Sequence, residues 1–187
     1  MTMKITTICG SNRRKGATKC ILGSIEKEIK QANISGLKTK NISLSDVHLE
    51  PCKGCLKCKK KGHCVIPDDF GKIAFRMIHS DLIVIGSPVY FSDVSSPVKA
   101  LIDRSVSLWH TKLLKDKKVI FVAATMESGT EHTLETLKIW AKDHEMNVIS
   151  TIEGIGEEVK DVLSNEKTIQ QIKDSVGAFK LTLPCES

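Results

Sequence analysis

The stretch Met3-Lys-Ile-Thr-Thr-Ile-Cys-Gly-Ser-Asn-Arg-Arg-Lys-Gly-Ala-Thr18 decides the fold. Its first seven residues form a short β-rich run that ends at Gly10. An amphipathic pattern follows from Ala17 to Gln31, before Gly36 stops it. A strand that passes through a tight turn into a helix is the repeating unit of a parallel α/β sheet.

The unit recurs. We predict further strands over residues 37–44, 81–86, 118–124 and 147–152, and further helices over 67–80, 96–108, 131–143 and 157–179. Strands that alternate with helices at this spacing predict an α/β fold with a five-stranded, doubly wound parallel sheet. With 187 residues, 41% of them hydrophobic, and no internal repeat or linker, we expect one domain over residues 1–187. The segment 48–66 interrupts the pattern as a cysteine-rich loop.

Composition narrows the classes of partner. The formal net charge is +6, but aromatic residues make up only 4% of the chain and do not interleave with the basic ones, which disfavours nucleic acid. The basic excess instead suits anionic cofactors and an acidic redox partner. The longest apolar runs, such as Val119 to Ala124, are far too short to cross a bilayer. We expect a soluble, cytoplasmic protein with no membrane partner.

Four of the seven cysteines lie within thirteen positions, at Cys52, Cys55, Cys58 and Cys64. Three cysteines at every third position, with a fourth soon after, is the spacing by which a short loop wraps a cubane iron-sulfur cluster. Two intervening residues let the loop turn back between sulfurs, and Gly54 and Gly62 allow the necessary backbone angles. Lysines in the same window would favour thiolates and offset the cluster's charge. This pattern predicts an electron carrier.

Three other interpretations of the cysteine run remain open. A zinc site usually has two separated Cys-X2-Cys pairs or mixes Cys with His, which fits the unbroken triple less well. A disulfide framework conflicts with the odd number of cysteines and with the closeness of the first three. A surface loop of metal-free thiols is the simplest alternative. In the small-ferredoxin pattern, three residues precede the fourth cysteine, whereas here there are five.

Ligands of such a sheet bind beyond the carboxyl ends of its strands, so three loops matter most. The first, Gly10 to Thr18, has small residues that let backbone N–H groups approach an anion. Ser11, Thr18 and Arg13 could complete a phosphate cup there. The spacing matches neither the Walker loop nor the dinucleotide fingerprint, which suggests a monophosphate. The alternative is an ordinary turn with an exposed basic pair.

The second loop, Gly86-Ser-Pro-Val-Tyr-Phe-Ser92, follows the third strand. Its adjacent Tyr90 and Phe91 could flank a flat ring, and a backbone stiffened by proline could bind the edge of that ring. Packing into the core is the alternative. The third loop, Ala124 to Gly129, follows the fourth strand and is not a nucleophile elbow, because it lacks the glycine before its serine.

Together, Gly-Ser-X-Arg-X-X-Gly-X-Thr at 10–18, the cysteine run ending in Cys64-Val-Ile-Pro-Asp-Asp69, and Gly86-Ser-Pro-Val-Tyr-Phe resemble the iron-sulfur flavoproteins. That family is a branch of the flavodoxin-like, NAD(P)H-dependent FMN reductase group. The resemblance covers most of the chain up to about residue 130, and the cysteine run is its specific element. It implies a flavodoxin-like three-layer sandwich with FMN and a [4Fe-4S] cluster, in a homodimer or homotetramer where the cluster of one subunit faces the flavin of a neighbour.

The resemblance also implies roles for individual residues. Cys52, Cys55, Cys58 and Cys64 would bind the cluster, and no side chain need act as a catalytic acid, base or nucleophile. The residues implied in FMN binding are Ser11, Arg13, Gly16, Ala17 and Thr18 for the phosphate, Pro88, Val89, Tyr90 and Phe91 for the ring, and Thr125, Met126, Glu127 and Gly129 for its other edge.

The expected activity is electron transfer by a flavin-dependent oxidoreductase. Candidate donors are ferredoxin or NAD(P)H, and candidate acceptors are oxygen, peroxide, a quinone or another protein. Two further hypotheses stay open: a cluster-free NAD(P)H-dependent FMN or quinone reductase, and a zinc-stapled flavodoxin-like binding module. We do not expect Cys9, Cys20 or Cys185 to be ligands, and we expect Trp109 and Trp140 to pack in a core or a subunit interface.

Overall fold

A computed structural model describes residues 2–183, so Cys185 lies outside the described residues. The strands are β1 (Lys4–Cys9), β2 (Lys38–Ser43), β3 (Leu82–Tyr90), β4 (Asp93–Val94), β5 (Lys118–Thr125) and β6 (Asn147–Ile155). The helices are α1 (Ala17–Gln31), α2 (Lys57–Lys61), α3 (Phe70–Ile78), α4 (Ser96–Arg104), α5 (Val106–Trp109), α6 (Thr130–Asp143), α7 (Val159–Ser164) and α8 (Glu166–Leu181), with a 3₁₀ turn, η1 (Leu44–Asp46).

Five parallel strands form the sheet in the order β2-β1-β3-β5-β6, and β4 adds a short antiparallel pairing to the end of β3. The order reverses at β1, which has β2 on one side and β3 on the other. The carboxyl ends of β1 and β3 therefore flank the topological switch point, where sheets of this type bind ligands. The predicted flavodoxin-like, doubly wound fold is confirmed.

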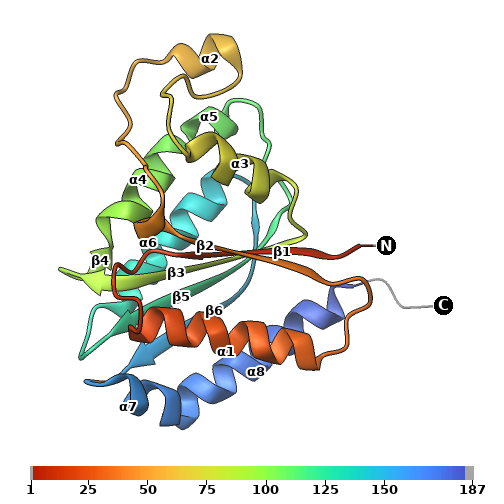
Figure 1. Cartoon of the computed structure of the whole chain (residues 1–187), viewed down its shortest axis with the longest axis vertical. Coiled ribbons are helices and arrows are strands. Elements are labelled where there is room, and N and C mark those ends of the chain that lie inside the picture. Colours follow the sequence, from red (N-terminus) through yellow and green to blue (C-terminus); the bar gives the residue numbers. More distant parts are fainter. Residues whose placement is uncertain (1, 184–187) are drawn as a thin grey trace.

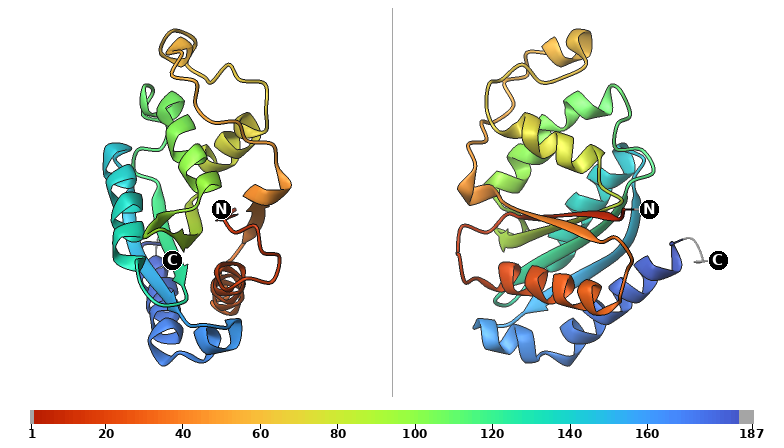
Figure 2. Two further views of the ribbon diagram at one scale, coloured as in Figure 1. Left: turned by 90° about the vertical axis from the view of Figure 1, so that its left-hand side faces the viewer. Right: turned by 45° about the vertical axis from the view of Figure 1, so that its right-hand side comes forward.

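Helices cover both faces of the sheet and form two cores (Figures 1 and 2). Alternate residues of β3 point to opposite faces, so Ile83 and Ile85 pack against α3, α4 and α6, whereas Leu82 and Val84 pack against α1, α7 and α8. These strand residues are at most 1% exposed. Strands buried on both faces explain the unbroken apolar runs in the sequence.

Two predicted helices are each divided in two. The predicted helix 96–108 is broken at Ser105, which separates α4 from α5. The predicted helix 157–179 is broken at Asn165. The Asn165 side chain accepts a hydrogen bond of 3.2 Å from the backbone N–H of Thr168 and so caps α8. The sequence carried this signal, because asparagine is a favoured helix-capping residue.

Two predicted strands are longer in the structure. The predicted strand 81–86 continues to Tyr90, so part of the proposed second loop is strand. Pro88 is tolerated because it lies past the last β1–β3 pair, Cys9–Gly86, and before Val89, where the pairing with β4 begins. The last strand likewise continues from residue 152 to Ile155.

The predicted helix 67–80 begins at Phe70, so Asp68 and Asp69 precede it. Asp68 instead points its carboxylate at Arg104. The cysteine-rich segment contains only the short helix α2 and lies at the end of the molecule above α3, α4 and α5 (Figure 1). Among residues 2–183, no helix has the length and apolar character needed to cross a membrane.

Candidate functional site

A cavity of about 350 Å³ lies where the loops after β1, β3, β5 and β6 converge. This volume falls within the range of small-molecule sites. Ten of the sequence-predicted residues line it: Ser11, Arg13, Gly16, Ala17, Thr18, Pro88, Val89, Tyr90, Thr125 and Met126. The structure thus brings all three predicted loops to one cavity at the switch point of the sheet.

The N-terminus of α1 provides the polar end of this cavity. Ser11 and Thr18 are 5% and 2% exposed, and the Ser11 hydroxyl accepts the backbone N–H of Arg13 at 3.2 Å. Within the described residues, no side chain caps the helix at Gly16. The first N–H groups of α1 are therefore available to an anion, which the helix dipole also favours. These groups fit a phosphate.

Three predicted residues do not line the cavity: Phe91, Glu127 and Gly129. Phe91 is fully exposed and has a φ of +49°, so its ring points away from the site. Gly129 has a φ of +91°, and a Cβ there would lie 2.9 Å from Cα of Ser92 and from Cγ1 of Val89. Gly129 therefore allows close packing against the end of β3 without contacting the cavity.

Sequence reasoning missed a fourth wall, formed by residues 156–159 after β6, and the additional lining residues Lys15 and Ala124. It missed this wall because the last strand was expected to end at residue 152. The signal was present, since Gly156 follows a strand and precedes a helix, as in the loop after β1.

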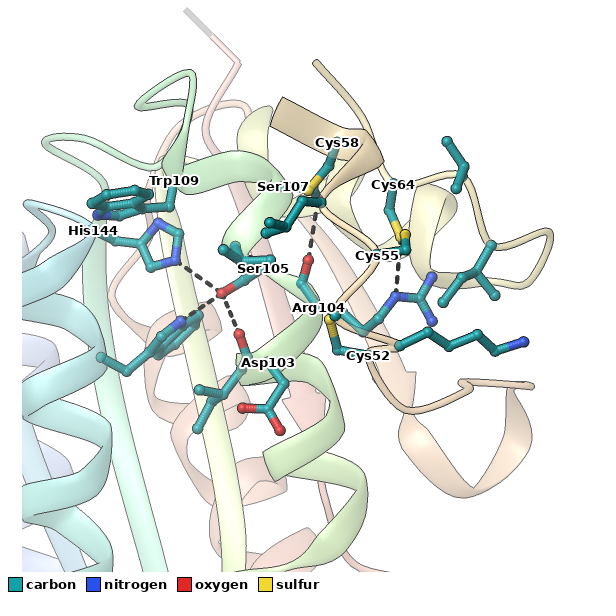
Figure 3. A pocket seen from close by; sticks show the side chains of 18 of the residues that line it. Cys52, Cys55, Cys58, Cys64, Asp103, Arg104, Ser105, Ser107, Trp109 and His144 are labelled. Atoms are coloured by element: carbon teal, nitrogen blue, oxygen red, sulfur yellow. Dashed lines mark hydrogen bonds between the residues drawn. The ribbon is translucent and has the colours of Figure 1, made fainter. Parts of the chain in front are cut away.

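The four cysteines of the loop line a second cavity, of about 590 Å³, at the other end of α4 (Figure 3). Cys58 is buried, Cys64 half-buried, and Cys52 and Cys55 exposed. Residues of α4, α5 and α6 form the opposite wall, including Arg104, Trp109 and His144. Four thiols around one cavity provide the donor set of an iron-sulfur cluster.

The loop backbone turns back between each pair of successive cysteines. Gly54, Leu56 and Gly62, with φ values of +60°, +53° and +73°, all lie in the left-handed region. One such residue separates Cys52 from Cys55, the next Cys55 from Cys58, and the last Cys58 from Cys64. Leucine rarely adopts this conformation, so the backbone at Leu56 is strained.

Within residues 2–183, no three His, Cys, Asp or Glu side chains lie close enough together to hold a single metal ion. In a cubane cluster each thiolate binds a different iron atom, so its sulfurs stand farther apart than those around one ion. The cysteine side chains fit a cluster in number, chemistry and shared cavity. His48 lies before the run and bonds to Glu50, and His63 lies within it and bonds to the Lys61 carbonyl; neither lines the cavity.

A buried arginine lies behind the cysteines. The Arg104 and Asp68 side chains are both 0% exposed and form two hydrogen bonds of 2.6 and 2.8 Å. Burial alone would raise the pKa of Asp68, but bonds from Arg104 and from the backbone N–H groups of Glu50 and Phe70 outweigh it and lower the pKa to about 2. Nε of Arg104 also donates to Sγ of Cys64 at 3.3 Å. Sequence reasoning did not identify this arginine.

Ser105 anchors the chain next to Arg104. Its hydroxyl accepts the indole N–H of Trp140 at 2.8 Å and donates to the Ile102 carbonyl at 2.6 Å. Because a hydroxyl has one proton, Nε2 of His144, 2.9 Å away, must be the donor in their contact. Burial lowers the pKa of His144, which keeps its ring neutral. Trp140 lies in the core, as expected, whereas Trp109 is half-exposed beside the cavity.

The sequence matches the NADPH-dependent FMN reductase family model over residues 3–159. It is 37% identical to an iron-sulfur flavoprotein of Methanocaldococcus jannaschii over 149 residues, which are 79% of this chain and 76% of that protein. It is 33% identical to an iron-sulfur flavoprotein of Methanosarcina thermophila, covering 79% of this chain and 77% of the relative.

Solved structures show the same fold at low sequence identity. An NADH:FMN oxidoreductase in its apo form superposes with a TM-score of 0.73 at 16% identity, covering 99% of this chain and 92% of that one. An azoreductase superposes with a TM-score of 0.70 at 12% identity, covering 95% and 99% of the two chains. The architecture is thus similar to that of flavin-dependent reductases.

Proposed function

The chain belongs to the NADPH-dependent FMN reductase family and to its iron-sulfur flavoproteins, and from this premise we propose that it carries FMN together with a [4Fe-4S] cluster and transfers electrons between them. The protein is a flavodoxin-like, flavin-dependent oxidoreductase. We propose the cluster, the residues that bind FMN and the cluster, and the electron donors and acceptors.

The 350 Å³ cavity would hold FMN. Ser11, Thr18 and the N-terminal N–H groups of α1 would bind the phosphate, with the exposed charge of Arg13 nearby. Pro88, Val89 and Tyr90 would contact the ring on one side, and Thr125 and Met126 on the other. Tyr90 and Met126, each at least half exposed, are free to cover a ring.

Cys52, Cys55, Cys58 and Cys64 would hold the cluster. When bound, FMN exchanges one or two electrons and a cluster only one, so the two groups together can split a two-electron reduction into single steps. The chain's own residues hold and orient the groups, and none of them has to transfer a proton or form a covalent bond.

Exposed charge around the cysteine loop favours an acidic redox partner. Lys57, Lys59, Lys60 and Lys61 in α2 and Lys53 before it are all exposed. Such a basic surface speeds encounter with an acidic protein. Ferredoxin or NAD(P)H would donate electrons, and oxygen, peroxide, a quinone or another protein would accept them.

A homodimer or homotetramer would bring the cluster of one chain to the flavin of another. No residue lines both cavities, and α4 runs from Ser96, next to the end of β3, to Arg104 at the cysteine cavity. Its eight residue steps correspond to about 12 Å along the helix axis. The two groups would therefore lie in separate cavities of one chain.

The convergence of four cysteines from one loop on a single cavity carries the proposal. Anaerobic purification followed by analysis of iron, sulfide, zinc and flavin tests it. Four irons and one FMN per chain are expected. Flavin without metal would support a cluster-free reductase, and zinc without flavin would support a binding module.

A further inference from the structure

Arg104, the last residue of α4, lies behind the cysteines, and the role that we assign to this arginine rests on the proposed cluster. Its guanidinium is completely buried and has contacts on every side. Nη1 donates to the Glu50 carbonyl at 2.7 Å and to Oδ2 of Asp68 at 2.6 Å, and Nη2 donates to Oδ1 of Asp68 at 2.8 Å. Nε donates to Sγ of Cys64 at 3.3 Å.

These contacts fix the direction of the Nε–H group. A guanidinium is planar and carries five N–H donors in a rigid fork. Three of them are held by Asp68 and Glu50, so the fourth is aimed at Cys64 without freedom to turn. The ring of Phe70, whose centroid lies 4.8 Å from Cζ, packs against the guanidinium. A lysine could not make the same set of bonds, because its ammonium is a single point charge.

The same contacts tie together the two ends of the cysteine segment. Glu50 lies two residues before Cys52, and Asp68 lies four residues after Cys64. The Asp68 carboxylate also accepts the backbone N–H groups of Glu50 at 2.9 Å and of Phe70 at 3.1 Å. Arg104 and Asp68 therefore close the base of the loop that carries all four thiols.

Cys64 differs from the other three cysteines in the hydrogen bond that its sulfur accepts. Among the described residues, its sulfur alone accepts a hydrogen bond from a side chain. Hydrogen bonds to the sulfurs are among the features that set the reduction potential of a cluster. The reduced cluster carries one more negative charge than the oxidised one, so a charged donor at a thiolate stabilises the reduced form more.

We propose that Arg104 is a positioning residue that holds Cys64 in place as a cluster ligand and raises the reduction potential of the cluster. Asp68 has the opposite electrostatic effect, because its carboxylate partly neutralises Arg104. The two members of the pair should therefore shift the potential in opposite directions when each is changed.

The test compares three variants of the loaded protein by redox titration followed with electron paramagnetic resonance. Arg104→Gln combined with Asp68→Asn removes both charges together, so no unpaired buried charge is left to unfold the chain. Its cluster potential is expected to shift to a more negative value, and a chelator should remove its iron about 10-fold faster. Asp68→Asn alone leaves Arg104 with the Cys64 sulfur as its remaining anionic partner, and in the loaded protein it is expected to shift the potential to a more positive value.

Lys99→Gln is the matched control, because it removes an exposed positive charge from the same helix. Its potential is expected to equal that of the wild type. An unchanged potential in the double variant, or shifts of the same sign in both Asp68 variants, would overturn the inference alone. Wild-type protein without iron would overturn the proposed function and the inference together.

Discussion

Thr18 lies at the polar end of the 350 Å³ cavity and packs against Gly86 of β3. Its side chain is buried and lines the cavity, and its methyl group packs where a Cβ on Gly86 would lie, at 2.8 Å. The hydroxyl is therefore held in one direction by packing of the methyl group. A hydroxyl fixed in this way can bind a phosphate without losing much conformational freedom on binding.

Replacing Thr18 by Val should weaken FMN binding while keeping the fold, because valine retains the packed methyl group and loses the donor. A hydrogen bond to a charged group contributes about 1.5–3 kcal/mol, which corresponds to a loss of affinity of about 10- to 100-fold. Fluorescence titration of the apoprotein with FMN measures this change. Ser24→Ala, which removes a hydroxyl farther along α1, should bind FMN as the wild type does. Equal affinity in both variants would remove Thr18 from the site.

The Asp68 carboxylate should make the fold sensitive to acid. Its pKa is about 2 in the folded chain, against about 3.9 when unfolded, so its contribution is fully present above about pH 5 and is lost as the pH falls through 2. The shift corresponds to about 2–3 kcal/mol of the free energy of unfolding. Urea unfolding of Cys58→Ala and of Cys58→Ala with Asp68→Asn, both expected to be cluster-free, measures it. The difference in the free energy of unfolding between the two variants should shrink from pH 7 to pH 3. A difference that does not depend on pH would contradict this account.

At the scale of elements, the contact of α1 with β3 positions the start of that helix. A Cβ on Gly86 would come within 3.0 Å of both the Thr18 methyl group and Leu22 Cδ1, so the helix approaches the strand only because residue 86 lacks a side chain. Gly23 lies on the same helix, and a Cβ added there would have no atom within 4 Å.

The two glycines should therefore respond oppositely to alanine. Gly86→Ala should lower the free energy of unfolding by about 1–3 kcal/mol through overpacking, and should weaken FMN binding because Thr18 is displaced. Gly23→Ala should raise that free energy by about 0.5–1 kcal/mol, because alanine is the better helix former. Urea denaturation followed by circular dichroism checks both values. Equal stabilities would mean that α1 is free to move away from the sheet.

The cysteine loop has its own cavity, so a change in the loop should remove the cluster without removing FMN. Cys58→Ala should abolish the brown colour of the protein but leave FMN bound, since no residue lines both cavities. Cys20→Ala, which changes a half-buried cysteine on α1, is the control and should keep its iron. Iron, sulfide and flavin analysis of both variants decides the result. Loss of flavin from folded Cys58→Ala would mean that the loop belongs to the flavin site.

At the scale of the whole molecule, the 350 Å³ cavity lies at the carboxyl edge of the sheet. The cysteine loop lies beyond α4 and α5 (Figure 1). If electrons pass between different chains, their rate should fall when the protein is diluted below the dissociation constant of the assembly. Stopped-flow measurement of cluster reduction across a range of concentrations tests this, with sedimentation as the check on assembly. A rate that stays constant while the assembly dissociates would show transfer within one chain.

The sequence by itself determined the order of strands and helices, the three ligand-facing loops and the spacing of the four cysteines. These features are local, because apolar periodicity indicates which face of a helix or strand is buried, and glycine indicates where the backbone turns. Helix α1 was predicted at its observed bounds, because its amphipathic pattern is uninterrupted.

Only the tertiary structure decided that Arg104 meets Asp68 and Cys64, which lie 36 and 40 positions away in the chain. It also decided that residues 156–159 form a wall of the 350 Å³ cavity and that Phe91 points away from it. The physical reason is that a periodic pattern shows that a side chain is buried but does not identify the distant group that will satisfy its charge. Arg104 follows the buried residues Val98 and Leu101 at helical spacing, but nothing in that spacing identifies Asp68 and Cys64 as its partners.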